Sequence, residues 1–167
     1  CSPIPVILYN VPGRTCCNIS AETCLELAFD FDNITGIKEA SGDMHQIMRI
    51  IKGKPENFSV ISGDDLLTLP VIAAGGVGVI SVLANAFPAQ CTELVNNALK
   101  NNFKLAREIQ FRLLELTELL FTEGNPSGIK AMLDAMNLCQ NILRLPLVPV
   151  SRTIYTRIQK AVEEVIN

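Results

Sequence analysis

The 167-residue sequence contains no tryptophan, a single histidine and only 5% aromatic residues. It lacks any apolar run near the roughly 18 residues that a membrane-spanning helix needs, and its first residues, CSPIPVILYN, lack the basic start of a signal peptide. The sequence also lacks a large excess of either charge: it has 14 Lys and Arg and 17 Asp and Glu, a net charge of −3, and no cluster of basic residues. These absences exclude membrane and nucleic-acid partners, and we expect a soluble, cytoplasmic protein.

Cysteine is present, but its spacing is not that of a metal site. The six cysteines form no CxxC pair and no zinc spacing, and no His-x-x-Cys or His-x₃-His motif accompanies them; they stand at positions 1, 16, 17, 24, 91 and 139. We therefore expect free, buried thiols and no bound metal.

What the sequence has is apolar residues, 49% of the total with a mean hydropathy of +0.30, in a pattern that alternates between strand and helix. Strands are predicted at 6–9, 34–38, 58–61 and 77–82. Helices are predicted at 20–28, 44–51 and 66–72, the last closed by Gly75-Gly76. The strands are short and β-branched without alternation, which is typical of parallel strands covered on both faces.

After the fourth strand the pattern predicts only helices. They fall at 85–99, 103–121, 128–136 and 151–165, and Pro146 and Pro149 prevent a continuous helix before the last. Two architectures fit: a small doubly wound sheet, or the second half of an eight-stranded (β/α)₈ TIM barrel followed by a helical extension. A whole barrel needs about 250 residues, so this chain cannot contain one. The barrel interpretation divides the chain into a half barrel at 1–100 and a helical domain at 101–167.

Polar residues follow each predicted strand at its carboxyl end. They are Tyr9-Asn10, Lys38-Glu39, the stretch 62–65 and Ser81. In parallel α/β folds this edge binds ligands and carries the chemistry, so the four positions predict one site.

Lys38 and Tyr9 are the candidates for chemistry at this edge. A strand-end lysine often lays its stem along apolar surface with its ammonium in water. Alternatively, Lys38 held among Ile34, Ile37 and Val60 is partly desolvated, which leaves more free amine to attack a carbonyl and form a Schiff base. Tyr9 could move protons at the same carbon, or it could be an interfacial tyrosine with a wet hydroxyl.

Arg14 follows Pro12-Gly13, which predicts a tight turn with proline second and glycine at positive φ third. Such a turn would hold Arg14 over the strand ends, where its guanidinium suits a carboxylate; an ordinary surface arginine is the alternative.

Three other signals are weaker. Gly75-Gly76-Val77-Gly78 precedes a strand and opens no helix, so it is a helix end and turn and not a phosphate loop. Asp64-Asp65 suits the N-terminus of a helix better than a metal, since no third ligand is apparent. His45 is expected to be a solvated surface residue.

Four motifs occur in a distinctive order: YNVPGRT at 9–15, GIKEASG at 36–42, SGDD at 62–65 and GVIS at 78–81. Together with Asn125-Pro126, Lys130 and LRLPL at 143–147, they resemble the dihydrodipicolinate synthase family along the whole chain. The resemblance implies a (β/α)₈ barrel with a C-terminal helical domain, a homo-oligomer (dimer or tetramer) and a class I aldolase-type lyase. Its substrates would be pyruvate and aspartate semialdehyde, on the way to diaminopimelate and lysine.

The resemblance also assigns roles. Lys38 matches the lysine that forms the imine with pyruvate, and Tyr9 matches the tyrosine that gives and takes protons. Arg14 matches the arginine that holds the carboxylate of the semialdehyde, Ile80 a residue whose backbone lines the pyruvate pocket, and Gly63 lies beside it. The imine nitrogen accepts the electrons, so no metal or organic cofactor is required.

One departure from the family is large. Four βα units that precede the strand of Tyr9 in the family have no counterpart here, and with them the hydroxyls near pyruvate, a tyrosine from a neighbouring subunit and most of the lysine-feedback site. We therefore expect a fragment that exposes sheet edges and an apolar inner face and is not a stable, active monomer. An N-acetylneuraminate lyase-type aldolase, which usually lacks the equivalent of Arg14, and a non-catalytic half-barrel scaffold are the alternatives.

Overall fold

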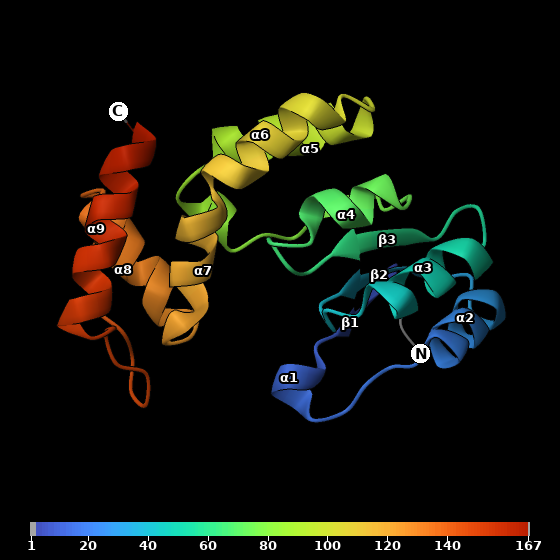
Figure 1. The fold of residues 1–167 in the computed structure, drawn as a ribbon. Coiled ribbons are helices and arrows are strands. Elements are labelled where there is room, and N and C mark those ends of the chain that lie inside the picture. Colours follow the sequence, from blue (N-terminus) through green and yellow to red (C-terminus); the bar gives the residue numbers. More distant parts are fainter. Residues whose placement is uncertain (1–2, 167) are drawn as a thin grey trace. The chain divides into compact units, whose positions relative to one another are not determined.

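The computed structural model describes residues 3–166 of the chain. The chain divides into two compact units. The first consists of Cys1–Ser81 with Val95–Asn102, and the second of Val82–Leu94 with Phe103–Asn167. Figure 1 shows the sheet and its helices in the first unit and the helices α7, α8 and α9 in the second.

The first unit is built on a four-stranded parallel sheet in the order β1-β2-β3-β4. The strands are β1 (Val6–Asn10), β2 (Ile34–Glu39), β3 (Ser59–Ser62) and β4 (Gly78–Val79). The helices that connect them are α1 (Pro12–Thr15), α2 (Ala21–Asp30), α3 (Met44–Gly53) and α4 (Thr68–Ala73). The four predicted strands and the βα alternation are confirmed, although β4 covers only Gly78–Val79 of the predicted 77–82, and a 3₁₀ helix follows at Leu83–Asn85.

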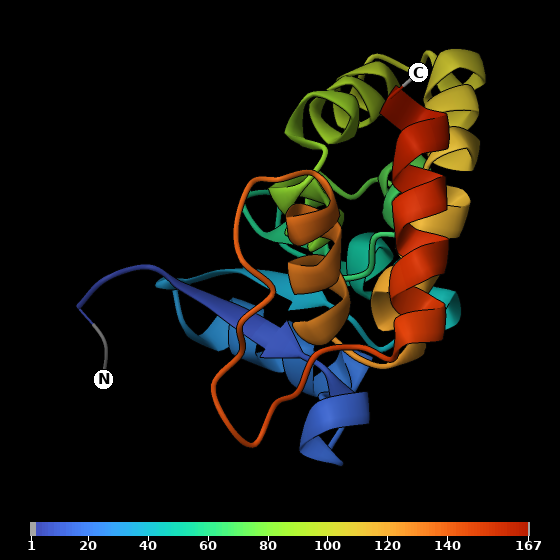
Figure 2. The same cartoon turned by 90° about the vertical axis from the view of Figure 1, so that its left-hand side faces the viewer.

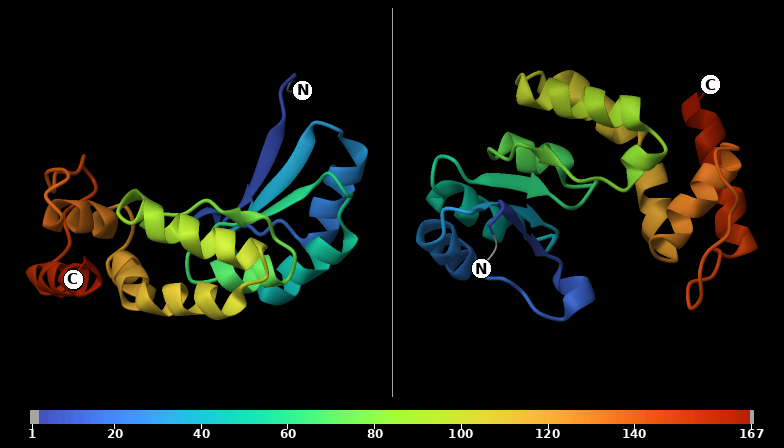
Figure 3. Two further views of the ribbon diagram at one scale, coloured as in Figure 1. Left: turned by 90° about the horizontal axis from the view of Figure 1, so that it is seen from above. Right: turned by 180° about the vertical axis from the view of Figure 1, so that it is seen from behind.

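Three helices cover one face of this sheet. Ile37 and Val60 point from β2 and β3 into a fully buried core, where they meet Ile47 of α3 and Val71 of α4. Helix α2 contributes Ala21, Cys24 and Ala28, and the cluster also contains Ile50 and Phe58. The left view of Figure 3 shows α2 and α3 lying along one side of the strands.

Local signals fix where these helices begin and end. The Ser20 side chain accepts the Thr23 N–H at 3.2 Å and begins α2, and Asp43 Oδ1 accepts the His45 and Gln46 N–H groups and begins α3. At the end of α4, Gly75 N–H donates to the Ile72 carbonyl and Gly76 N–H to the Val71 carbonyl. This is a Schellman motif, and Gly75 supplies its positive φ of 113°. The predicted helix end at Gly75-Gly76 is confirmed.

The opposite face of the sheet is more open than the sequence predicts. Burial alternates along β1, where Ile7 and Tyr9 are exposed while Asn10 is buried, and it alternates along β3 as well. The prediction of strands covered on both faces is therefore wrong for the described chain. Since the helices protect one face only, the face of Tyr9 is accessible.

The pairing of β1 with β2 contains one irregularity. Val6 lies opposite Ile34 but Ile7 lies opposite Gly36, so Thr35 is an extra residue on β2. Beyond this bulge the register is regular through Asn10 and Glu39. Bulges of this kind increase the local twist and change which face a side chain occupies.

Helices α5 (Pro88–Leu99), α6 (Phe103–Arg112), α7 (Leu114–Thr122), α8 (Ser127–Ala135) and α9 (Arg152–Ile166) follow the sheet. The single predicted helix at 103–121 is wrong, because the chain breaks at Leu113 between α6 and α7. Helix α5 also begins later than predicted, at Pro88. The predicted helices at 128–136 and 151–165 are confirmed within a residue or two.

Within the second unit, α7, α8 and α9 pack together and are tied by side chains. Both carboxylate oxygens of Glu123 accept from Ser151, one from its N–H and one from its hydroxyl, each at 2.6 Å, at the start of α9. The Tyr155 hydroxyl donates to Asp134 Oδ2 at 2.5 Å and joins α9 to α8. None of the helices described between residues 3 and 166 combines the length and the apolar character that crossing a bilayer would require.

Candidate active site

The register of the parallel sheet aligns the strand ends that carry the candidate residues. Tyr9 lies opposite Lys38, and Lys38 lies opposite Ile61. One residue further, Asn10 lies opposite Glu39, which lies opposite Ser62. The expected gathering of polar residues at one edge is therefore confirmed for β1, β2 and β3.

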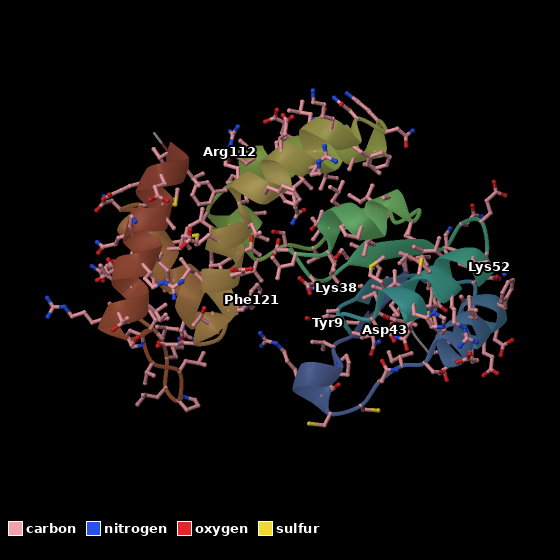
Figure 4. The ribbon with its side chains drawn as sticks, in the orientation of Figure 1. Tyr9, Lys38, Asp43, Lys52, Arg112 and Phe121 are labelled. Carbon is pink, nitrogen blue, oxygen red and sulfur yellow. The ribbon has the colours of Figure 1, made fainter. Side chains whose placement is uncertain are left out.

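Lys38 and Tyr9 are in direct contact. The Lys38 Nζ lies 4.3 Å from the centre of the Tyr9 ring, and Figure 4 shows the two residues side by side at the end of the sheet. Attraction between an ammonium and the face of an aromatic ring holds such a pair together. Lys38 is half-buried while Tyr9 is 48% exposed, so an amine and a phenol meet where a small molecule can reach both.

The surroundings of Lys38 differ from the sequence-based expectation. Ile37 and Val60 point into the core on the helix-covered face, and Ile34 packs against the same core, so these residues do not surround the amine. Successive strand residues point to opposite faces, which places Lys38 on the open side.

Gly63 instead makes room for the lysine. A Cβ at Gly63 would lie 3.0 Å from Lys38 Cε, 3.1 Å from its Cγ and 2.7 Å from the Ala40 Cβ. The Gly63 N–H also donates to the Glu39 carbonyl at 2.7 Å, which fixes the loop across the lysine stem. The glycine therefore permits a close approach that any other residue would block.

Arg14 lies on α1, an exposed single turn of helix that directly follows β1 in Figure 2. The predicted type of turn is wrong, because Gly13 is not at positive φ and the 12–15 segment is helical. The left-handed residue is Cys16, with φ of 55°, and its N–H donates to the Pro12 carbonyl to end the turn. Proline at the first helical position explains why a helix starts there.

Ile80 lies just past β4, and its side chain is 45% exposed. Its N–H donates to the Ser62 carbonyl at 2.9 Å, which extends the pairing of β3 with the last strand. Next to it, the Ser81 hydroxyl donates to Asp65, a carboxylate that is almost fully buried. Asp64 Oδ1 accepts the Leu66 N–H, so it caps the turn before α4 and not the helix itself, which begins at Thr68.

The sequence placed two further polar residues at the strand ends but gave them no specific role, and they lie behind the site. Asn10 and Glu39 are each only 1% exposed, and Asn10 Nδ2 lies 3.1 Å from both carboxylate oxygens of Glu39. Ser41 N–H and Gln46 Nε2 also donate to that carboxylate, at 2.8 and 3.1 Å. The only sequence signal was an amide and a carboxylate that directly follow the two candidate residues.

The buried carboxylate also affects a cysteine. Burial, and in second place the charge of Glu39, raises the pKa of the Cys24 thiol from 9.0 to about 11. Cys24 is fully buried, but Cys16 and Cys17 are exposed, so the expectation of buried thiols is wrong for those two; Cys1 lies outside the described residues.

Within residues 3–166, no group of three or more His, Cys, Asp and Glu side chains could hold a metal ion. His45 is exposed, as expected, and its N–H is used by Asp43 at the start of α3.

A parallel βα sheet with a lysine and a tyrosine in contact at its carboxyl edge defines an α/β protein with an amine as its candidate reactive group. The model of the dihydrodipicolinate synthetase family matches residues 1–165. The chain belongs to this family.

The chain is similar to curated relatives named 4-hydroxy-tetrahydrodipicolinate synthase. It is 53% identical to that of Phocaeicola vulgatus over 161 residues, which are 96% of this chain and 54% of the relative. It is 54% identical to that of Azobacteroides pseudotrichonymphae over 158 residues, which are 95% of this chain and 53% of the relative.

Solved structures agree with these sequence matches. The dihydrodipicolinate synthase of Thermotoga maritima superposes with a TM-score of 0.96 at 39% identity, over 98% of this chain and 57% of its own. That of Aquifex aeolicus superposes with a TM-score of 0.94 at 40% identity, over 98% of this chain and 56% of its own. The chain therefore spans about half the length of the relatives that it matches.

Proposed function

We propose that this chain carries the imine-forming part of a 4-hydroxy-tetrahydrodipicolinate synthase, a class I aldolase-type lyase that condenses pyruvate with aspartate semialdehyde. The observation that carries the proposal is the contact of Lys38 Nζ with the Tyr9 ring at 4.3 Å on the open face of a parallel sheet. Relatives about 50% identical to this chain bear that name, which supports the same substrates and a cytoplasmic place in diaminopimelate and lysine synthesis.

In the proposed reaction, the Lys38 amine attacks the ketone carbon of pyruvate and water leaves, which gives an imine. Tyr9 exchanges protons with the carbinolamine oxygen and nitrogen during this step. Loss of a methyl proton then forms an enamine, since the imine nitrogen accepts the electron pair. The enamine carbon attacks the aldehyde carbon, and the amino group of the semialdehyde finally displaces the lysine nitrogen, which closes the ring and frees Lys38.

The other site residues bind the substrates or shape the pocket around Lys38. Arg14 on α1 offers a planar guanidinium to the carboxylate of the semialdehyde. Gly63 leaves the space that the lysine stem occupies, and the backbone at Ile80 lines the pyruvate pocket. No metal and no organic cofactor takes part in this mechanism.

We further propose that the chain supplies the last four βα units of a (β/α)₈ barrel, at 1–100, and the helical domain that follows them in the sequence, at 101–167. The order of elements supports this assignment, because four parallel βα units come first and only helices follow. Function then requires the remaining βα units, and association into a homo-oligomer.

The test is to trap the imine. The chain is incubated with pyruvate and borohydride, which reduces the imine to a stable secondary amine, and the modified lysine is identified by mass spectrometry. We expect one adduct, on Lys38, and none on the exposed Lys52. The Lys38→Arg variant should lose it, and Tyr9→Phe should slow its formation about a hundredfold.

Folded protein without an adduct on Lys38 would leave the non-catalytic scaffold as the function. If an adduct forms, aspartate semialdehyde and N-acetylmannosamine are compared as acceptors. If only N-acetylmannosamine reacts with the enamine that pyruvate forms on Lys38, and aspartate semialdehyde does not, the chain is instead assigned to the sialic-acid lyases.

A further inference from the structure

The buried Asn10–Glu39 pair lies directly behind the candidate reactive residues. Asn10 follows Tyr9 on β1, and Glu39 follows Lys38 on β2, so the two pairs occupy adjacent rungs of the sheet. Because neighbouring strand residues point to opposite faces, the carboxylate lies on the helix-covered side and does not touch a substrate on the open side.

Burying the Glu39 side chain removes its carboxylate from water, which costs hydration free energy. Its side chain is 1% exposed, and within residues 3–166 the salt bridges join other residues, Arg49 with Glu22 and Lys160 with Glu164. Four neutral hydrogen-bond contacts compensate for the lost hydration: two from Asn10 Nδ2, one from Ser41 N–H and one from Gln46 Nε2. A carboxylate accepts at both oxygens, so every one of these donors is satisfied by one side chain.

The same network reaches the segment that carries Arg14. Asn10 Oδ1 accepts the Ile19 N–H at 3.0 Å, and Asn10 Nδ2 donates to Asn18 Oδ1 at 2.8 Å. Asn18 Nδ2 in turn donates to Gln46 Oε1 at 2.9 Å. The chain between β1 and α2, which includes α1, is therefore anchored at its return to the sheet by the pair that joins β1 to β2.

We propose that Glu39 is a positioning residue that acts through Asn10 to hold the Lys38 amine against the Tyr9 ring and to anchor the α1 segment of Arg14. The inference rests on the proposed function of Lys38 and Tyr9, and Glu39 itself touches no reacting atom. Backbone pairing joins the two strands as far as the Ala40 N–H, which donates to the Asn10 carbonyl at 2.8 Å, and the side chains of Asn10 and Glu39 add a second link at the same rung. The buried carboxylate strengthens this last rung beside Lys38 and Tyr9, where a displacement of about 1 Å can cost a hundredfold in rate.

The test uses Glu39→Gln, which keeps the volume but turns one acceptor oxygen into a donor that faces other donors. Two quantities are measured on folded protein. The first is the upfield ring-current shift of the Lys38 ε-methylene protons in lysine-labelled protein, assigned with Lys38→Arg. The second is the rate of pyruvate–borohydride trapping as a function of pyruvate concentration.

We expect Glu39→Gln to lose most of the ring-current shift. Its trapping rate at saturating pyruvate should fall about tenfold to a hundredfold, while the half-saturating pyruvate concentration changes little. Partial unfolding would lower the final amount of adduct and not its rate. The control Glu26→Gln, at an exposed position on α2, should change neither quantity. The double variant Asn10→Asp with Glu39→Gln restores an amide–carboxylate pair across the two strands. It should recover part of the ring-current shift and part of the trapping rate.

An unchanged ring-current shift in folded Glu39→Gln would overturn the inference, whatever the trapping rate. If Glu39→Gln does not fold, Gln46→Ala decides, because it removes one donor from the carboxylate at an ordinary helix position. It should reduce the shift and the rate in the same sense, and no change in either rejects the proposal. If the wild type shows the shift but forms no adduct, the proposed function fails while the positioning role is still judged by the shift.

Discussion

At the scale of single residues, the candidate site depends on close approach as much as on charge. The Lys38 stem runs against a loop position that has no side chain, and its amine ends against the Tyr9 ring. Sequence reasoning could identify both residues because lysine and tyrosine are unusual at the ends of apolar strands. It could not identify the partners of Glu39, because Asn10 and Gln46 are 29 and 7 residues away along the chain.

Gly63→Ala tests the close approach directly. The added Cβ would lie 2.7 Å from the Ala40 Cβ and 3.0 Å from Lys38 Cε, so the lysine stem or the loop must move. We expect pyruvate trapping on Lys38 to slow about tenfold or more. The matched control is Gly13→Ala, where a Cβ meets nothing within 4 Å, and it should trap at the wild-type rate. Equal rates for both variants would show that the glycine is not needed.

The Cys24 thiol links stability to alkaline pH. Its pKa is raised from 9.0 to about 11 by burial and by the charge of Glu39, so the folded state favours the neutral thiol. The resulting stability is complete below pH 9 and is lost as the pH rises through about 11. We expect the wild type to lose up to about 3 kcal/mol relative to Cys24→Ala over this range, measured by urea unfolding. Parallel pH dependences of the two proteins would contradict the assignment.

At the scale of secondary structure, caps and turns carry the information that hydrophobic patterns lack. Ser20 and the Gly75-Gly76 pair were readable because their residue types are specific for helix ends. The break between α6 and α7 could not be predicted, since Leu113 is a buried apolar residue of a type that is common within helices. The α1 turn was misassigned because proline and glycine fit a β-turn and a first helical turn equally well.

Asp43 should stabilise the first unit through α3. Its carboxylate accepts the His45 and Gln46 N–H groups, and Figure 4 shows it at the end of the helix opposite Lys52. We expect Asp43→Ala to lower the free energy of unfolding by about 1 kcal/mol. Asp32→Ala, at an exposed position outside the helices, should be nearly neutral in the same urea titration. Equal losses would show that the cap contributes nothing specific.

The start of α9 should respond to acid. Hydrogen bonds from the Ser151 hydroxyl and N–H lower the pKa of Glu123 below its usual 4.5. The stability from this clamp is therefore present above pH 4.5 and is lost as the pH falls through the lowered value. Glu123→Gln should be less stable than the wild type in thermal unfolding at pH 7. The gap between the two melting temperatures should narrow as the pH is lowered from 4.5 through the pKa of Glu123, and a gap of constant size would rule out the charge as its cause.

At the scale of the whole molecule, the fold class followed from the βα alternation, and the polar strand ends followed from the topology. The open face of the sheet could not be predicted, because strands rich in β-branched residues have similar sequences whether one face or both faces are covered. Ile7, Tyr9 and Ile80 are each about half exposed, and β1 and β4 are edge strands in the described chain. Exposed apolar side chains beside an unpaired edge favour association.

We therefore expect the 18.2 kDa chain to self-associate in solution. Ile7→Lys, which places a charge on the open face of the edge strand, should shift sedimentation velocity profiles toward the monomer. Asn57→Lys, an equal change of charge in an exposed loop, should leave them unchanged. A monodisperse wild-type monomer with full synthase turnover would contradict this expectation and the fragment interpretation together.

The bulge at Thr35 separates the two ends of β2. Ile34 and Ile37 are three positions apart, which would place them on opposite faces of a regular strand, yet both pack against the same core. The extra residue absorbs this mismatch before the pairing of Tyr9 with Lys38 begins. A change of one residue in the length of the turn leading into β2 can thus be accommodated at the bulge while the amine and the phenol stay face to face.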